Sequence, residues 1–180
     1  MSPRLALTAI LLTVVAAGTA SSGAQQTPAP APYPLDAVPD KMPFDIPYGA
    51  PISLERAMAA IAATVAEARK HDWKLDVAVV DSGGNLVAFE RMDGAQLASI
   101  QIAEHKARAA ASFRRETKVF EKGIQQGGNL YVMTLDGVIG SRGGIPLVEG
   151  GKLIGAIGCS GGTGSQDEVA CKAGVAAIIK

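Results

Sequence analysis

The chain has 180 residues, of which 48% are hydrophobic and 4% aromatic, and its 17 basic and 17 acidic side chains give a formal net charge of zero. This length and apolar content allow one sizeable core, so a second folded domain is not expected once the N-terminal segments are set aside. No run of five or six like charges occurs, which argues against a nucleic-acid surface or a polybasic membrane patch.

Residues 1–24 have the order of parts that is typical of a secretory signal peptide. A short cationic start (MSPR) precedes the apolar run LALTAILLTVVAA, and Ser22 and Ala24 form a small-residue cleavage site. The apolar run is shorter than the roughly 20 residues that span a bilayer, so a transmembrane anchor is the less favoured alternative. Cleavage would remove one basic residue, Arg4, and leave 16 basic against 17 acidic side chains. We therefore expect a periplasmic or secreted protein without a transmembrane anchor after cleavage.

Residues 25–51 are predicted to form a proline-rich linker or arm. Their eight prolines remove backbone donors and favour extended polyproline geometry. Three apolar side chains near the end of the arm, Phe44, Ile46 and Tyr48, leave two alternatives open. Either they contact the folded domain or a neighbouring subunit, or the whole segment is a solvated linker. The folded domain itself is expected over residues 52–180.

The folded part alternates between helical and strand periodicity. The predicted elements, in chain order, are a helix from Ser53 to about His71, a β-hairpin of strands 75–81 and 86–92, an alanine-rich helix at 99–113, a short helix after Thr117, two or three strands within 130–158, and a last helix started by a Ser165-x-x-Glu168 capping box. This order predicts an α+β fold, in which helices cover an antiparallel sheet.

Four segments occur in an order that resembles the GlcG/HbpS family of haem-binding and haem-degrading-like domains. They are RMDGA (91–95), AEHKARAAASF (103–113), SRGGIPL (141–147) and GAIGCSGGTGSQDEVACKAG (155–174). The pairing of GGIPL with GxIGxSGG and a following QDE is the most specific element, and the resemblance covers residues 53–180. It implies a five-stranded antiparallel sheet with helices on both faces, a homo-oligomer, and haem as cofactor. In some members it also implies haem breakdown, or action beside a sensor kinase outside the membrane.

Two departures from the family pattern affect the expected site. Haem-binding relatives have a threonine in the KAxTA part of the central helix that is associated with the iron, and Ala109 stands at the matching place here. The strand that usually reads GAIGVSGG carries Cys159 in place of valine, and Cys171 follows on the next helix. In an exported protein these two cysteines are candidates for a disulfide, which sequence leaves open because Cβ geometry cannot be read from it.

The central helix carries the first group of candidate ligand-binding residues. His105 and Arg108 lie on one stripe of this helix, and Lys106 projects about 100° away. His105 is the candidate iron ligand because neutral imidazole suits haem iron; the alternative is a solvated or hydrogen-bonded helix histidine. His71 and Met92 are the other candidate axial ligands. Lys106 and Arg108 are candidates for contact with a carboxylate, since small alanines leave room around them, and a solvated helix face is the alternative.

The SRGGIPL segment carries the second group. Gly143 and Gly144 leave backbone N–H groups uncovered, and Arg142 beside them can make a two-pronged contact with a carboxylate. The stretch is therefore a candidate anion-binding concavity whose exit is stiffened by Pro146. The alternative is a glycine-rich connection without a ligand. The glycines that follow, within residues 149–152, are predicted to form only a hairpin turn.

The sequence shows neither a metal-hydrolase constellation nor an activated nucleophile. It has two histidines and no CxxC spacing, and a cysteine on a strand is usually buried and inert. Three hypotheses remain: an exported module that binds haem or a related tetrapyrrole and assists its degradation, a non-enzymatic binding module for a small organic carboxylate, and a structural or signalling oligomer. The family resemblance favours the first, although the low aromatic content argues against a large flat apolar pocket.

Overall fold

The computed structural model describes residues 38–42 and 44–179. The predicted signal peptide (1–24) and the first part of the predicted arm (25–37) lie outside the described residues. In chain order the elements are α1 (Leu54–Lys70), β1 (Asp76–Asp81), β2 (Leu86–Arg91), α2 (Ala98–Ser112), α3 (Lys118–Gln125), the 3₁₀ helix η2 (Leu130–Thr134), β3 (Gly144–Glu149), β4 (Lys152–Ser160) and α4 (Gly164–Ile178). Within the described residues, no helix is both long and apolar enough to cross a membrane.

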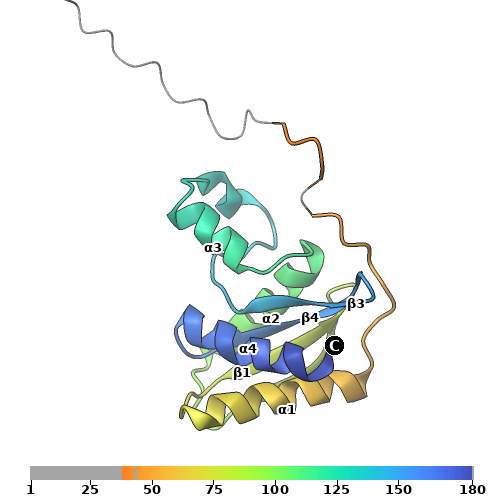
Figure 1. Ribbon diagram of the computed structural model, residues 1–180. Coiled ribbons are helices and arrows are strands. Elements are labelled where there is room, and N and C mark those ends of the chain that lie inside the picture. The colour runs from red at the N-terminus through yellow and green to blue at the C-terminus, as the bar shows by residue number, and fades with distance from the viewer. Residues whose placement is uncertain (1–37, 43, 180) are drawn as a thin grey trace, which may run out of the picture. The chain divides into compact units, whose positions relative to one another are not determined.

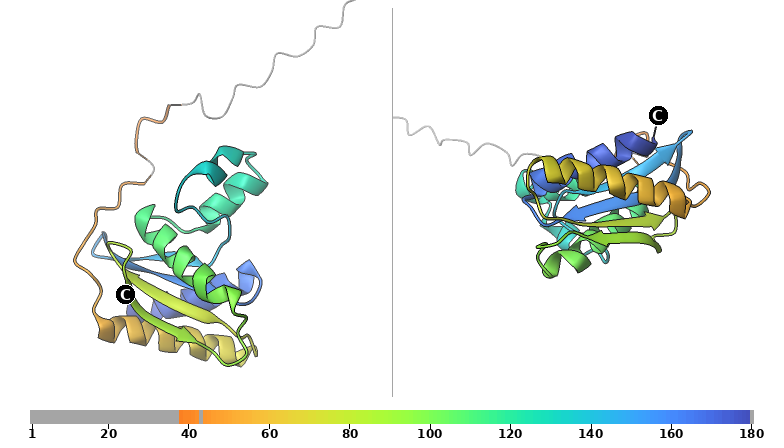
Figure 2. Two further views of the ribbon diagram at one scale, coloured as in Figure 1. Left: turned by 180° about the vertical axis from the view of Figure 1, so that it is seen from behind. Right: turned by 90° about the horizontal axis from the view of Figure 1, so that it is seen from below.

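The four strands form one sheet in the order β2-β1-β4-β3, and every neighbouring pair is antiparallel. Helix α2 covers one face of this sheet, and α1 and α4 lie side by side on the other face (Figures 1 and 2). The predicted α+β fold, an antiparallel sheet with helices on both faces, is confirmed.

The sheet has four strands rather than the five that the family resemblance implies. Residues 130–158 contribute only β3 and β4, because Leu130–Thr134 forms the helix η2 instead of a strand. Val132 is the one buried residue of this run, so the run has no alternating apolar face that could pack as a strand. The predicted turn at residues 149–152 is confirmed, with Gly150 and Gly151 both at positive φ.

Alternate side chains of β1 enter two separate cores. Val77 and Val79 pack in the core beneath α1 and α4, whereas Ala78 and Val80 pack beneath α2. The α2 core consists largely of alanines, which bring the helix backbone close to the sheet. At Gly158 on β4 an added Cβ would overlap the α2 backbone, so this close approach requires glycine.

The helix starts agree with the sequence for α1 and differ for α4. Ser53 caps α1 as predicted, because its hydroxyl accepts a hydrogen bond from a first-turn N–H. The capping box of α4 lies two residues before the predicted one, at Thr163 and Gln166. Thr163 has an extended backbone, and its N–H donates to the Gln166 side chain at 2.8 Å. Ser165 and Glu168 therefore lie inside α4, and Glu168 contacts neighbouring cations instead.

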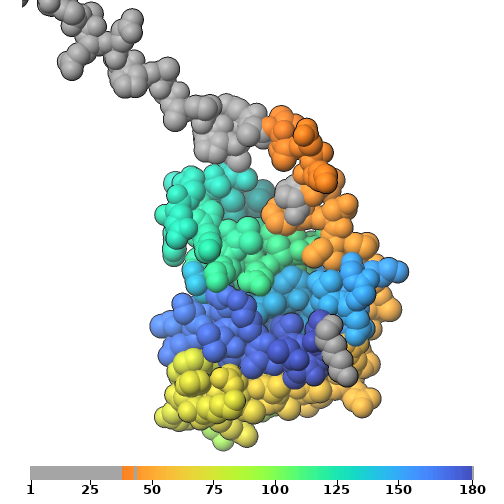
Figure 3. Space-filling view, viewed as in Figure 1, coloured from red at the N-terminus to blue at the C-terminus, as the bar shows by residue number. Residues whose placement is uncertain are grey.

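The end of the predicted arm lies against the folded domain (Figure 3). Tyr48 forms an isolated parallel bridge with Leu153 at the start of β4. Ile46 packs against the core beneath α2. The centre of the Phe44 ring lies 3.2 Å from the guanidinium carbon of Arg115. Of the two alternatives, contact with the folded domain is the one that the structure shows for these three side chains.

Candidate functional site

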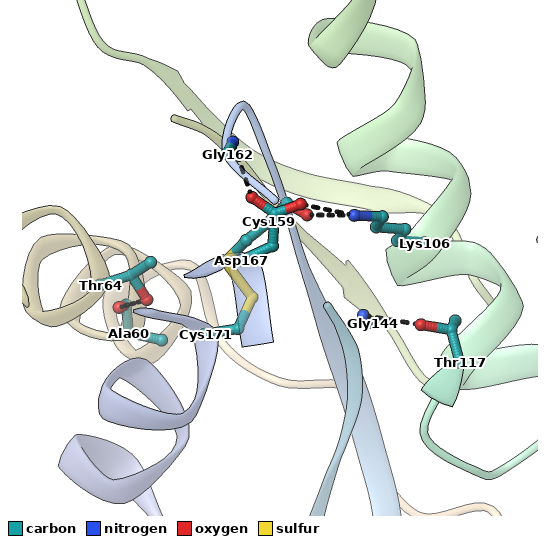
Figure 4. The surroundings of a disulfide bond; sticks show 9 residues. All are labelled: Ala60, Thr64, Lys106, Thr117, Gly144, Cys159, Gly162, Asp167 and Cys171. Carbon is teal, nitrogen blue, oxygen red and sulfur yellow. Dashed lines mark hydrogen bonds and ion pairs between the residues drawn. A yellow bond between two sulfur atoms is a disulfide. The ribbon is translucent and has the colours of Figure 1, made fainter. Parts of the chain in front are cut away.

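Lys106 projects from α2 into a buried ion pair with Asp167 of α4 (Figure 4). Its ammonium donates to an Asp167 carboxylate oxygen at 2.8 Å and to the Cys159 carbonyl at 3.0 Å. The other Asp167 oxygen accepts from the Gly162 N–H at 3.0 Å. Burial raises the pKa of the Asp167 carboxyl, and the Lys106 ammonium acts in the opposite direction. The carboxylate that meets Lys106 therefore belongs to the protein itself.

Arg142 is also held by acidic side chains of the chain. Its Nε donates to Glu121 of α3 at 2.7 Å, and its backbone N–H donates to the other Glu121 oxygen at 2.8 Å. A terminal nitrogen lies 3.4 Å from Glu168 of α4. The hydrogen bond to Glu121 raises the pKa of Arg142 and outweighs the opposing effect of desolvation. The charge around this segment is therefore balanced, not purely cationic.

Gly143 and Gly144 are buried, and both allow close packing, because an added Cβ at either one would overlap neighbouring atoms. The Gly144 N–H donates to the Thr117 hydroxyl at 2.9 Å, and an added Cβ at Gly144 would overlap the Lys106 carbonyl. Pro146 lies in β3 at the edge of the sheet, where proline is tolerated. These contacts argue against the predicted anion-binding concavity over residues 141–146, which stays a prediction. This stretch is a packed junction of α2, α3, β3 and α4 in which the cations already face carboxylates.

A disulfide joins Cys159 of β4 to Cys171 of α4, with an S–S distance of 2.06 Å and a Cα–Cα distance of 5.9 Å (Figure 4). Both cysteines are fully buried in the core beneath α1 and α4. The carbonyl of Cys159 is the same group that accepts from Lys106. The disulfide and the buried ion pair therefore hold the same end of β4.

His105 and Arg108 lie on the side of α2 that faces away from the sheet. Arg108 forms an exposed pair with Glu104, one turn earlier on the same helix, at 2.8 Å. The half-buried ring of His105 makes no hydrogen bond or ion pair with another described residue.

The other two candidate axial ligands lie elsewhere in the fold. His71 stacks on Trp73 with ring centroids 4.4 Å apart, and Met92 is buried in the core. Among the described residues, no group of three or more His, Cys, Asp or Glu side chains forms a metal site.

A cavity that sequence reasoning missed lies between α3, η2 and the end of the arm. We call it the α3–η2 cavity; its volume is about 270 Å³, and it is lined by Phe44, Phe113, Arg115, Val119, Phe120, Gly123, Asn129, Tyr131, Val132 and Leu135. The signal in the sequence was that Phe113, Phe120 and Tyr131 lie near one another in a chain with few aromatic residues. No local spacing connects them, because they come from separate elements.

Asp76, at the start of β1, is a second feature that the sequence did not reveal. Its side chain is fully buried, and neither carboxylate oxygen has a hydrogen-bond partner among the described residues. Its neighbour across the sheet, Ser160, is hydrogen-bonded to Ser99 of α2. Burial raises the pKa of the Asp76 carboxyl, against the opposing effect of Arg91 on β2.

Asp76→Asn should increase the free energy of unfolding near neutral pH. Because the folded-state pKa of Asp76 lies above the unfolded value, the stability that protonation provides is present in acid and is lost as the pH rises through the folded-state pKa. Asparagine does not ionise, so the gain should disappear below the ordinary pKa of aspartate. Urea unfolding of both proteins across this pH range measures the difference. A variant that is less stable than the wild type near neutral pH contradicts the prediction.

Comparison with known proteins agrees with the fold. Residues 52–176 match the family described as "Haem degrading protein HbpS-like". Protein GlcG of Escherichia coli K12 is 42% identical over 109 residues, which are 61% of this chain and 81% of GlcG. The crystal structure of a double mutant of Streptomyces reticuli HbpS has a TM-score of 0.65 and 31% identity, covering 78% of this chain and 95% of that one. The crystal structure of a PduOC–haem complex has a TM-score of 0.65 and 29% identity, covering 72% of this chain and 96% of that one. The chain belongs to the HbpS-like family.

Proposed function

We propose that this chain is an exported haem-binding domain in which His105 is the iron ligand. The observation that carries the proposal is the difference in contacts between the two histidines of the chain, His71 and His105. His71 is stacked on Trp73 and lies 3.4 Å from Glu67, whereas His105 has no partner among the described residues. Membership of the HbpS-like family and the likeness to PduOC, whose crystal structure contains haem, support haem as the ligand.

The outward side of α2 fits several requirements of haem. The imidazole of His105 is a suitable axial ligand, and bound haem would supply a redox-active iron there. Arg108 follows within one turn, and because its pair with Glu104 is exposed, little free energy opposes exchange of this partner for a haem propionate. Ala109 is buried and has no hydroxyl, so it contributes no ligand atom.

One helix surface covers only one side of a flat macrocycle, so the site also needs a second wall. We include in the proposal a homo-oligomer in which another copy of the chain supplies this wall. The family description extends the proposal to haem breakdown. In the titration described below, breakdown would be detected as a gradual loss of the haem absorbance when a reductant is added in the presence of dioxygen, the oxidant that ring opening consumes.

Titration of the purified protein with hemin tests the proposal. The wild type should give a saturable absorbance change, and His105→Ala should weaken binding by about 10-fold or more, the range found when groups that support a bound metal are removed. His71→Ala is the matched control and should bind hemin like the wild type. Equal affinities of wild type and His105→Ala for hemin, with the same spectrum, would contradict the assignment of His105.

The proposal of export is supported by the order of residues 1–24 and by the disulfide between Cys159 and Cys171. Disulfides of this kind persist in oxidising compartments and are rare in the cytosol. The intact mass of protein isolated from its native host tests this point. It should correspond to a chain that begins near Gln25, and a mass that retains residues 1–24 would contradict export with cleavage.

A further inference from the structure

We propose that the α3–η2 cavity is a separate ligand site for a small aromatic carboxylate, with Arg115 as its anion-binding residue. His105 is not among the residues that line this cavity, and the cavity lies outside the segment in which the sequence predicted an anion site. The proposal depends on the environment of Arg115, on the walls of the cavity and on its size.

Arg115 is held in place by aromatic rings rather than by an acid. Its guanidinium carbon lies 3.2 Å from the centre of the Phe44 ring, 5.5 Å from that of Phe120 and 5.9 Å from that of Phe113. Its Nε donates to the Phe113 carbonyl at 3.0 Å. Burial lowers the pKa of Arg115, and the charge of Arg114 adds to this effect. The rings therefore orient a cation that is partly removed from water.

Several other arginines of the chain have a carboxylate partner; the pairs are Arg56 with Glu149, Arg108 with Glu104, and Arg142 with Glu121 and Glu168. Arg115 has no carboxylate within ion-pair distance among the described residues. Its two terminal nitrogens also donate to no acceptor of the described residues. A partly desolvated charge without a counterion is costly, and a carboxylate that accepts from both terminal nitrogens offsets this cost. The missing partner of Arg115 is therefore an anion.

The cavity walls select what this anion is attached to. Phe113 and Phe120 meet edge to face, with ring centroids 5.1 Å apart and an interplanar angle of 75°. Val132 and Leu135 continue the apolar surface from η2 and the residues after it. Flat aromatic groups pack well against such rings. The side chain of Asn129 adds a polar group that can orient a ligand.

The size of the cavity separates this ligand from haem. Its volume of about 270 Å³ lies below the roughly 300–1,000 Å³ that is typical of sites for drug-sized molecules. A compound with one or two rings suits this space, and a tetrapyrrole exceeds it. An aromatic carboxylate combines the three features that the cavity requires: small size, a flat apolar body and a negative charge.

Naphthoate is a suitable probe, and naphthylmethanol is its matched uncharged control. Titration followed by calorimetry or by chemical-shift changes should show saturable binding of naphthoate to the wild type. Naphthylmethanol should bind at least about 10-fold more weakly, the scale expected for a hydrogen bond to a charged group. Equal affinities for the two compounds, or no saturable binding of naphthoate at millimolar concentration, would overturn the proposal.

Two variants locate the probe. Arg115→Gln should weaken naphthoate binding by about 10- to 100-fold, whereas Arg114→Gln should not, because Arg114 donates to the Ile46 carbonyl and does not line the cavity. Gly123→Leu fills the cavity with Arg115 left in place, since an added Cβ there meets Asn129 only at ordinary contact distance, 3.8 Å. It should abolish naphthoate binding and leave hemin binding unchanged. Naphthoate affinity that survives in Gly123→Leu would show that the probe binds elsewhere and would overturn the proposal.

Discussion

Lys106→Ala should lower the free energy of unfolding by about 3–5 kcal/mol, the largest effect that we expect for a single substitution in this chain. The side chains of Lys106 and Asp167 are 2% and 3% exposed, so removal of the ammonium leaves a carboxylate that water cannot reach. The Cys159 carbonyl loses a donor at the same time. Urea unfolding at neutral pH measures this loss.

The double variant Lys106→Met, Asp167→Asn separates charge from packing. Methionine keeps much of the lysine stem, and asparagine still offers an oxygen to the Gly162 N–H, which donates to Asp167 at 3.0 Å. The double variant should therefore recover most of the stability that Lys106→Ala loses. Arg108→Ala is the surface control: its exposed pair with Glu104 should contribute no more than about 1 kcal/mol. If Lys106→Ala were as mild as Arg108→Ala, the buried pair would not stabilise the fold.

The elements of the fold could be predicted because their signals are local. The helix after Ser53, the hairpin of β1 and β2 and the alanine-rich α2 follow from periodicity and turn residues within short windows. The predicted start of α4 differs from the observed one because two overlapping patterns, Thr163-x-x-Gln166 and Ser165-x-x-Glu168, both match a capping box. The choice between them was not local, since Glu168 binds Lys118 of α3 at 2.8 Å.

The charged residues of the candidate site could be found in the sequence, but their partners could not. Lys106 and Asp167 are 61 residues apart, and Arg142 and Glu121 are 21 apart. No periodicity relates such positions, so the cations seemed free to bind an external anion. Arg115 shows the opposite case. No pattern in the sequence singles it out, but it lies beside an aromatic cavity, and no carboxylate of the described residues pairs with it.

The glycines of residues 140–162 have two structural roles that the sequence does not separate. Gly150 and Gly151 occupy the predicted turn at positive φ. Gly144 and Gly158 instead lie where the backbone of α2 touches the sheet, and an added Cβ at either one would overlap that helix. A glycine that exposes its N–H to a ligand and a glycine that admits a neighbouring helix are identical in the sequence. Only the position of α2 distinguishes them.

Loss of the disulfide should lower the free energy of unfolding by about 3 kcal/mol, because the bond closes a short loop and restricts the unfolded chain. The loop spans a sequence separation of 12 residues between Cys159 and Cys171. Cys159→Ala combined with Cys171→Ala removes the bond without leaving an unpaired thiol in the core, and urea unfolding under oxidising conditions compares it with the wild type. The same comparison under strong reducing conditions is the control. Once the wild-type bond is reduced, the free energies of unfolding of the two proteins should converge to within about 1 kcal/mol, since both then have an open chain.

A difference in free energy of unfolding that persists after reduction would attribute the loss to packing of the two sulfur atoms. No gap under oxidising conditions would mean that the bond contributes nothing to the stability of the end of β4, where the Cys159 carbonyl also accepts from Lys106.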